Sequence, residues 1–122
     1  MRDRRSYASF MLLSHVPMAG ACLVADPFIA CIYAMSVAAS VAYHRSHETR
    51  FRVLDYRLAW LWVVCVVWQF ACTPTWHTPL IAAAAVAIYA SCVRTSCRNH
   101  YETYHPVWHV VAGVGTILLH LS

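Results

Sequence analysis

The chain carries three histidines whose spacing suits the binding of a single metal ion. His105 and His109 are four residues apart, so on a helix their imidazoles would share one face and could grip the same ion. His44 lies in a different apolar segment and would add a third nitrogen. Three protein ligands that leave one position open are the arrangement of a catalytic zinc site.

A serine and an aspartate are placed to support hydrolysis at such a site. Bound zinc lowers the pKa of its water toward about 7, which makes hydroxide available at neutral pH. Asp55 follows His44 by eleven positions and would hold that water or take its proton. Ser40 lies one helical turn before His44 and could donate a hydrogen bond to a ligand or to a developing oxyanion.

The same residues also fit a purely structural network. Ionisable groups inside apolar segments are costly and need partners, so these five side chains could simply satisfy one another between helices. We interpret His15, His77 and His120 as isolated polar contacts between helices. His47 and His100 are interpreted as solvated side chains of loops that carry arginine.

The composition indicates that membrane-spanning helices position these residues. Of the 122 residues, 61% are apolar and only 11% are charged, against roughly 25% charged in soluble domains. The apolar residues come in long blocks, and one span needs about 20 of them. Five blocks with short connections nearly exhaust the length. This predicts one all-α domain over residues 1–122, an integral membrane bundle of about five transmembrane helices.

The predicted spans cover residues 7–25, 28–44, 54–72, 80–93 and 105 to the end. His15 and Pro17 interrupt the first span, so we expect a kink there. Asp26-Pro27 is a turn signal, and the polar stretches 45–52, 73–79 and 94–104 are expected to be loops. Pro106 suits the first turn of the last span. The basic start followed by an apolar run is also typical of a signal peptide, but we expect it to be retained as a helix.

The arginines are distributed as in a multi-pass membrane protein. Eight of the nine precede the first span, separate the second from the third or separate the fourth from the fifth. Five spans put these three segments on one side, and the opposite loops contain no arginine, which is the positive-inside pattern. We therefore expect the N-terminus on the inner face, with His44, Asp55, His105 and His109 near that face. The net charge of +4 is too small and dispersed to indicate nucleic-acid binding.

At these residues the chain resembles a family of membrane enzymes. Ser40-Val-Ala-Tyr-His44 has the pattern Ser-x-x-x-His, Asp55 follows, and the segment from His105 to Gly115 reads H-x-x-W-H-x-x-x-G-x-G. Together these motifs are similar to the alkaline ceramidase, adiponectin-receptor and haemolysin-III superfamily of transmembrane hydrolases. The resemblance implies zinc on the three histidines, with Ser40 and Asp55 in support, and hydrolysis of a membrane lipid amide such as ceramide. The family has seven spans where five are predicted here, and a bundle of this size would enclose a long acyl chain by forming an oligomer.

A second resemblance indicates a protein without catalysis of its own. His44 followed by Asp55-Tyr56 is similar to the small haem-bearing anchor subunit of succinate dehydrogenase, in which the His is an axial haem ligand and the Asp-Tyr pair lies near the quinone pocket. This alternative implies haem b on His44 and membership of a larger membrane assembly. The pair His105 and His109 has no place in that pattern. The organelle stays open between the endoplasmic reticulum or Golgi and the mitochondrial inner membrane.

Overall fold

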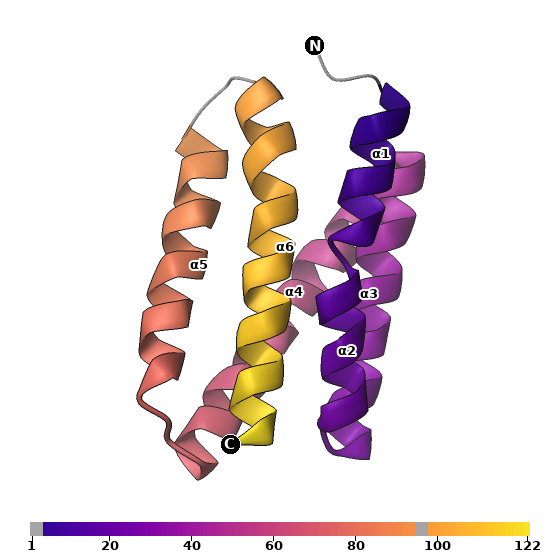
Figure 1. Ribbon diagram of the computed structural model, residues 1–122. Coiled ribbons are helices and arrows are strands. Elements are labelled where there is room, and N and C mark those ends of the chain that lie inside the picture. Colours follow the sequence, from indigo (N-terminus) through magenta and orange to yellow (C-terminus); the bar gives the residue numbers. More distant parts are fainter. Residues whose placement is uncertain (1–3, 95–97) are drawn as a thin grey trace.

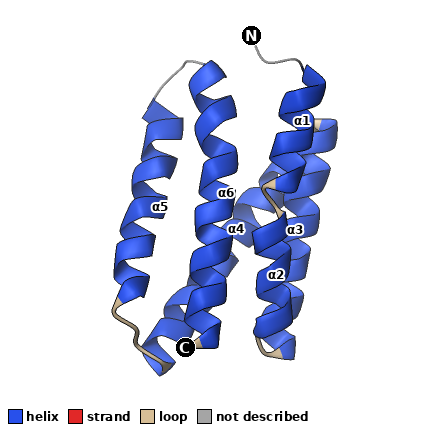
Figure 2. Ribbon diagram, in the orientation of Figure 1, coloured by secondary structure: helices blue, strands red, loops and turns tan. Residues whose placement is uncertain are grey.

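The protein is a bundle of roughly parallel and antiparallel helical rods (Figure 1). The computed structural model describes residues 4–94 and 98–122, with side chains described for residues 9–91 and 104–122. In these residues the regular structure is helical, and no strand is present (Figure 2). The helices are α1 (Arg4–Leu13), α2 (Val16–Val24), α3 (Pro27–Ser46), α4 (Thr49–Cys72), α5 (His77–Arg94) and α6 (Arg98–Leu121). Because α2 continues the line of α1 after a short break, the six helices form five rods (Figure 1).

The all-α prediction is confirmed for the described residues. Two helices are long and apolar enough to cross a membrane, α3 with a mean hydropathy of 1.4 and α4 with 1.3. Shorter apolar stretches cover Ser9–Val24 and His77–Ser91. Within the described residues, two of the five predicted spans therefore qualify by length and composition, and the five-span membrane bundle stays a prediction.

The predicted kink in the first rod is confirmed. Pro17 lies in the first turn of α2, where it has no amide hydrogen to donate to the preceding turn. The amide of His15 bonds to the carbonyl of Leu12, three residues back, at 3.2 Å. In a continuous helix that amide would bond to Met11. Regular hydrogen bonding resumes with the amide of Ala19, which donates to the His15 carbonyl at 2.8 Å.

The start of α3 follows the predicted turn signal. The Asp26 carboxylate accepts the amides of Phe28 at 3.1 Å and of Ile29 at 3.2 Å, which satisfies two of the free donors at a helix start. Pro27 takes the first helical position, where its missing amide hydrogen costs nothing.

Two predicted loops are largely helical instead. The stretch 45–52 contains the end of α3 and the start of α4. The chain reverses there at His47, which adopts a left-handed conformation with φ of 56°, and its amide donates to the Tyr43 carbonyl at 2.7 Å. Residues 98–104 belong to α6, so Pro106 lies inside that helix rather than in its first turn. The physical reason is that polar residues beyond an apolar block can continue its helix, since hydropathy marks the block and not the helix end.

Helix α6 packs mainly against α2 and α5, while α3 packs against α4 and α2. Two glycines permit the close approach of α6. A Cβ added to Gly113 would lie 2.6 Å from the amide nitrogen of Met18, and a Cβ on Gly115 would overlap the side chain of Ile81. Gly113 therefore lets the backbone of α6 touch α2 directly beside the break in the first rod.

The core between α3, α4 and the C-terminal part of α6 is aromatic and hydrogen-bonded. Tyr33 is fully buried and stacks on Trp62 with ring centroids 4.0 Å apart. The Trp62 indole donates to the hydroxyl of Thr116 at 3.1 Å, and the Tyr33 hydroxyl bonds to Nε2 of His120 at 2.9 Å. These contacts join α3 and α4 to the C-terminal part of α6.

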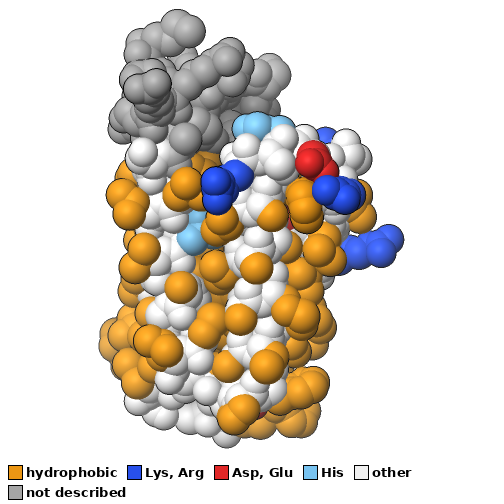
Figure 3. Space-filling view, turned by 90° about the vertical axis from the view of Figure 1, so that its right-hand side faces the viewer, with side chains coloured by type: hydrophobic (Ala, Val, Ile, Leu, Met, Phe, Trp, Pro, Cys, Tyr) orange, Lys and Arg blue, Asp and Glu red, His pale blue; other side chains and the backbone are white. Residues whose placement is uncertain are grey.

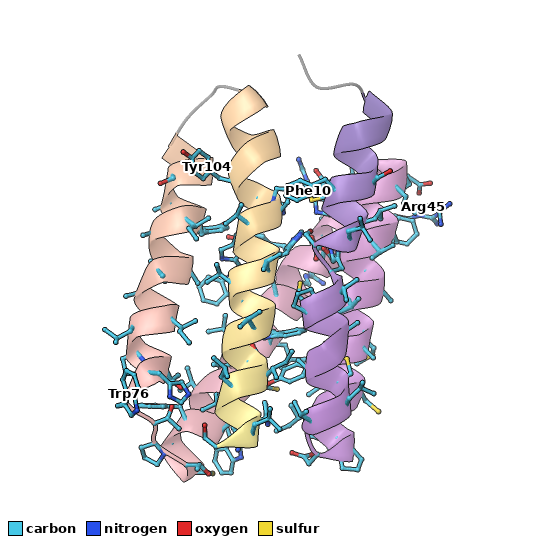
Figure 4. All side chains as sticks on the ribbon, viewed as in Figure 1. Phe10, Arg45, Trp76 and Tyr104 are labelled. Carbon is cyan, nitrogen blue, oxygen red and sulfur yellow. The ribbon has the colours of Figure 1, made fainter. Side chains whose placement is uncertain are left out.

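The surface differs between the ends and the sides of the bundle. The start of α1, the end of α3, the end of α5 and the start of α6 lie at one end (Figure 1). Arg45 lies toward that end, and Trp76, which is 81% exposed, lies at the other (Figure 4). Between the two ends, apolar side chains cover much of the face that Figure 3 shows, and most of its charged side chains lie near the upper end of that view.

Candidate metal centre

Three histidines from three rods converge in the upper half of the bundle. They are His15 at the break in the first rod, His44 in the last turn of α3 and His109 in α6. Their ligand nitrogens all lie within 4.8 Å of one another. The His15 and His109 side chains are 3% and 2% exposed, and their ring centroids are 4.2 Å apart. Three close histidines in this arrangement could hold a metal ion.

The donor set fits a transition-metal ion. Nε2 of His44 is buried and has no hydrogen-bond partner among the described residues, and such a polar atom is costly unless something binds it. Nitrogens that share one tetrahedral zinc lie roughly 3.4 Å apart. Side-chain rotations that move each ring nitrogen by about 1 Å would therefore bring the three close enough to bind one ion. Imidazole ligands suit zinc, copper, iron and nickel, and the geometry by itself does not select among them.

The group overlaps with the predicted ligand set and extends it. His44 and His109 belong to it as predicted. The ring of His105 borders it, with its centroid 4.5 Å from that of His109 and 5.1 Å from that of His44. His105 also stacks on Trp108 at 5.8 Å. The metal role of His105 stays a prediction.

His15 was not expected in this group, because it has no partner at helical spacing in the sequence. The available signal was the pair Ser14-His15 just before Pro17 inside an apolar segment. Two polar residues at a point where the helix must break indicate a local need for hydrogen bonds. That signal does not reveal which distant helix supplies the neighbours, so His15 was interpreted as an isolated contact.

The break in the first rod orients two of the three imidazoles. The Met11 carbonyl accepts the Ser14 hydroxyl at 2.5 Å and Nδ1 of His15 at 2.9 Å. Because a carbonyl only accepts, the hydrogen of His15 lies on Nδ1. The Ser14 proton is likewise committed to Met11, so its oxygen accepts Nδ1 of His109 at 3.0 Å. In both rings the lone pair is therefore on Nε2, the nitrogen left for a ligand.

Ser40 and Asp55 adjoin this group. The Ser40 hydroxyl is buried and lies 2.8 Å from Nε2 of His15. Since the hydrogen of His15 is on Nδ1, the hydroxyl is the donor in that contact. The Asp55 side chain, half-buried near the start of α4, adjoins Ser40 and is an alternative acceptor for the same hydroxyl proton. Ser40 therefore links Asp55 to the histidines through His15.

The remaining histidines are mostly as interpreted. His120 is a polar contact between helices, through the Tyr33 hydroxyl. His47 is exposed, and the side chain of His100 lies outside the described residues. Nε2 of His77 is buried and has no hydrogen-bond partner in the described part of the chain, so its interpretation as a satisfied contact is not supported.

The site is thus a buried group of three imidazoles with a serine and a carboxylate beside it. Comparison of the chain with protein-family models, with curated proteins and with solved structures finds no match.

Proposed function

We propose that this chain is a multi-pass membrane protein that binds zinc and hydrolyses the amide bond of a membrane lipid such as ceramide. The observation that carries the proposal is the convergence of His15, His44 and His109 in one group next to Ser40 and Asp55. Zinc held by three of the clustered imidazoles would supply the Lewis acidity that activates water and polarises a carbonyl.

In this proposal Asp55 is the proton carrier. Its carboxylate holds the attacking water, takes one proton from it and returns that proton to the leaving nitrogen. Hydrolysis then yields a fatty acid and a free amine, with water consumed. Ser40 holds the carboxylate once zinc has taken Nε2 of His15, because its buried hydroxyl proton, which otherwise goes to His15, can then go to Asp55. The Met11 carbonyl fixes the ring orientation of His15, and the Ser14 hydroxyl fixes that of His109, so that both Nε2 atoms stay directed at the zinc site.

The surface of α4 supports a position in the lipid bilayer. Trp60, Val64, Val67 and Trp68 are each at least 60% exposed along this helix, and a soluble protein rarely shows so large an apolar face. The candidate site lies in the half of the bundle where α3 ends and α4 begins. An amide-linked lipid places its carbonyl near the headgroup boundary, which would bring it to this level. A second copy of the chain would lengthen the wall available to an acyl chain.

The contacts of His44 favour an ion over haem b. Its ring centroid lies 5.1 Å from that of His105, 5.4 Å from that of His109 and 5.7 Å from that of His15. Three imidazoles at this distance suit a small ion better than the broad face of a porphyrin. A Soret band in the purified protein would reverse this choice and favour the anchor-subunit alternative.

The experiment is metal analysis followed by a hydrolysis assay in lipid vesicles. We expect zinc in the purified protein and release of fatty acid from one or more ceramides, measured by mass spectrometry. Asp55→Asn should keep the zinc and lose turnover, and His109→Ala should lose the zinc. His120→Ala is the matched control, because this histidine lies on the same helix but bonds to Tyr33. Zinc without cleavage of any lipid amide or ester would contradict the hydrolase.

A further inference from the structure

The break in the first rod has a chemical consequence for the metal centre. Its central atom is the carbonyl oxygen of Met11, whose residue is fully buried. Pro17 stops the regular ladder, and the His15 amide moves to Leu12. The Met11 carbonyl is thereby available to two side-chain donors, Ser14 and His15.

Metal-binding histidines usually donate their second ring nitrogen to a carbonyl or carboxylate, which fixes the tautomer and the direction of the ring. His15 meets this condition directly at Met11, and His109 meets it through the hydroxyl of Ser14. One carbonyl therefore fixes two imidazoles from helices that are far apart in the sequence. His44 adds a buried Nε2 with no hydrogen-bond partner among the described residues.

We propose that the break in the first rod is a metal-binding device, and that His15 is the third ligand beside His44 and His109, fixed by the Met11 carbonyl. The inference rests on the metal centre of the proposed function and not on the hydrolysis. His105 then borders the ion without holding it, although it shares a helix face with His109. Its stacking on Trp108 gives the ring a separate partner.

Ser40 gives this assignment a distinctive property. Its hydroxyl donates to Nε2 of His15, the same lone pair that an ion would take. A bound ion displaces that hydrogen bond, and the hydroxyl proton can then go to the adjoining Asp55 carboxylate instead. If His15 is a ligand, Ser40→Ala removes a competitor, so zinc affinity should stay equal or rise. If His15 is not a ligand, this substitution has no reason to raise the affinity.

The test measures zinc affinity of the full chain in detergent by competition with a chromophoric chelator. His15→Ala should lower the affinity by at least 100-fold, whereas His105→Ala should change it by less than about threefold. Ser14→Ala and Pro17→Ala should each lower it about 10–100-fold, the range typical of groups that orient ligands. His120→Ala is the control on α6 and should bind as the unaltered protein does. Loss of affinity in His105→Ala together with retention in His15→Ala would overturn the proposal.

A ligand exchange keeps the test decisive where His15→Ala does not fold. His15→Cys offers a thiolate, and cobalt bound in place of zinc should then show an intense sulfur-to-cobalt charge-transfer band in the near ultraviolet. The spectrum of the unaltered protein loaded with cobalt shows how much of that band comes from the native cysteines, and it is subtracted as the baseline. Cobalt binding to His15→Cys without that band would place the residue outside the coordination sphere. If metal binding follows these expectations but no lipid is cleaved, the ligand assignment stands and the hydrolase fails.

Discussion

Gly113→Ala tests whether the contact between α6 and α2 sets the position of His109. The added Cβ would lie 2.6 Å from the amide nitrogen of Met18 and 2.7 Å from the carbonyl carbon of Pro17. Ordinary contact begins at 3.4 Å, so the two helices must separate by the difference, about 0.8 Å. Both neighbours are backbone atoms, which cannot rotate away as a side chain would.

The displacement should reach the metal centre. His109 lies four residues before Gly113, roughly 6 Å along the helix axis, and moves with it. The bond from Nδ1 of His109 to Ser14, now 3.0 Å, would lengthen to about 3.8 Å and be lost as a hydrogen bond. We expect a loss of about 1–3 kcal/mol in the free energy of unfolding, as for overpacked cores. Zinc affinity should fall about 10–100-fold as the ligand loses its orienting partner.

Denaturant unfolding and chelator competition measure the two effects on the same preparation. Gly115→Ala is the matched control, since its Cβ would meet the side chain of Ile81 on α5, away from the histidines. That variant should lose stability and keep its zinc affinity. A Gly113→Ala protein with unaltered stability and affinity would refute the reasoning, because the backbone contact would then have no influence on His109.

Three further predictions concern the core, the metal and the topology. Trp62→Phe removes the indole hydrogen that Thr116 accepts at 3.1 Å but keeps a ring against Tyr33. Unfolding by denaturant should therefore show a loss of about 1 kcal/mol, and an unaltered free energy would mean that this bond adds no stability. A chelator should lower the stability of zinc-loaded protein by about 2.7 kcal/mol where free zinc had been 100 times its Kd; an unmoved unfolding transition would contradict a zinc bound only by the folded state. In a cysteine-free background and sealed vesicles, Glu48→Cys and Asn99→Cys should be labelled from one side and Thr75→Cys from the other. Labelling of Glu48→Cys and Asn99→Cys from opposite sides would contradict the five-span topology.

Local signals in the sequence predicted the helix starts and breaks that depend on one or two residues. Asp26 and Pro27 define the start of α3 through bonds within three positions. Pro17 breaks the first rod because it lacks an amide hydrogen, whatever surrounds it. The predicted end of α3 and the predicted starts of α4 and α6 are wrong, because the polar residues there lie outside the apolar block but still inside the helix.

The composition of the metal group depends on tertiary contacts that no local pattern contains. His44 and His109 belong to recognisable strings, and both are in the group. His15 enters because Gly113 brings α6 to the broken part of the first rod and Ser14 bonds to His109 across that contact. A spacing of four residues predicts that His105 and His109 share a face, but it cannot tell which of them a third helix will approach.

The bond between Ser14 and His109 joins positions 95 apart in the chain, and this separation has a consequence for biosynthesis. A ribosome completes the first rod long before it reaches α6. In a bilayer, the Ser14 oxygen would then lack the hydrogen bond that His109 of α6 donates, at a cost that lipid cannot offset. A nascent chain that stops before α6 would keep this defect permanently, which gives membrane quality control a feature by which to recognise it. Metal capture would accordingly be a late event, following synthesis of the last helix, and would mark chains that have finished folding.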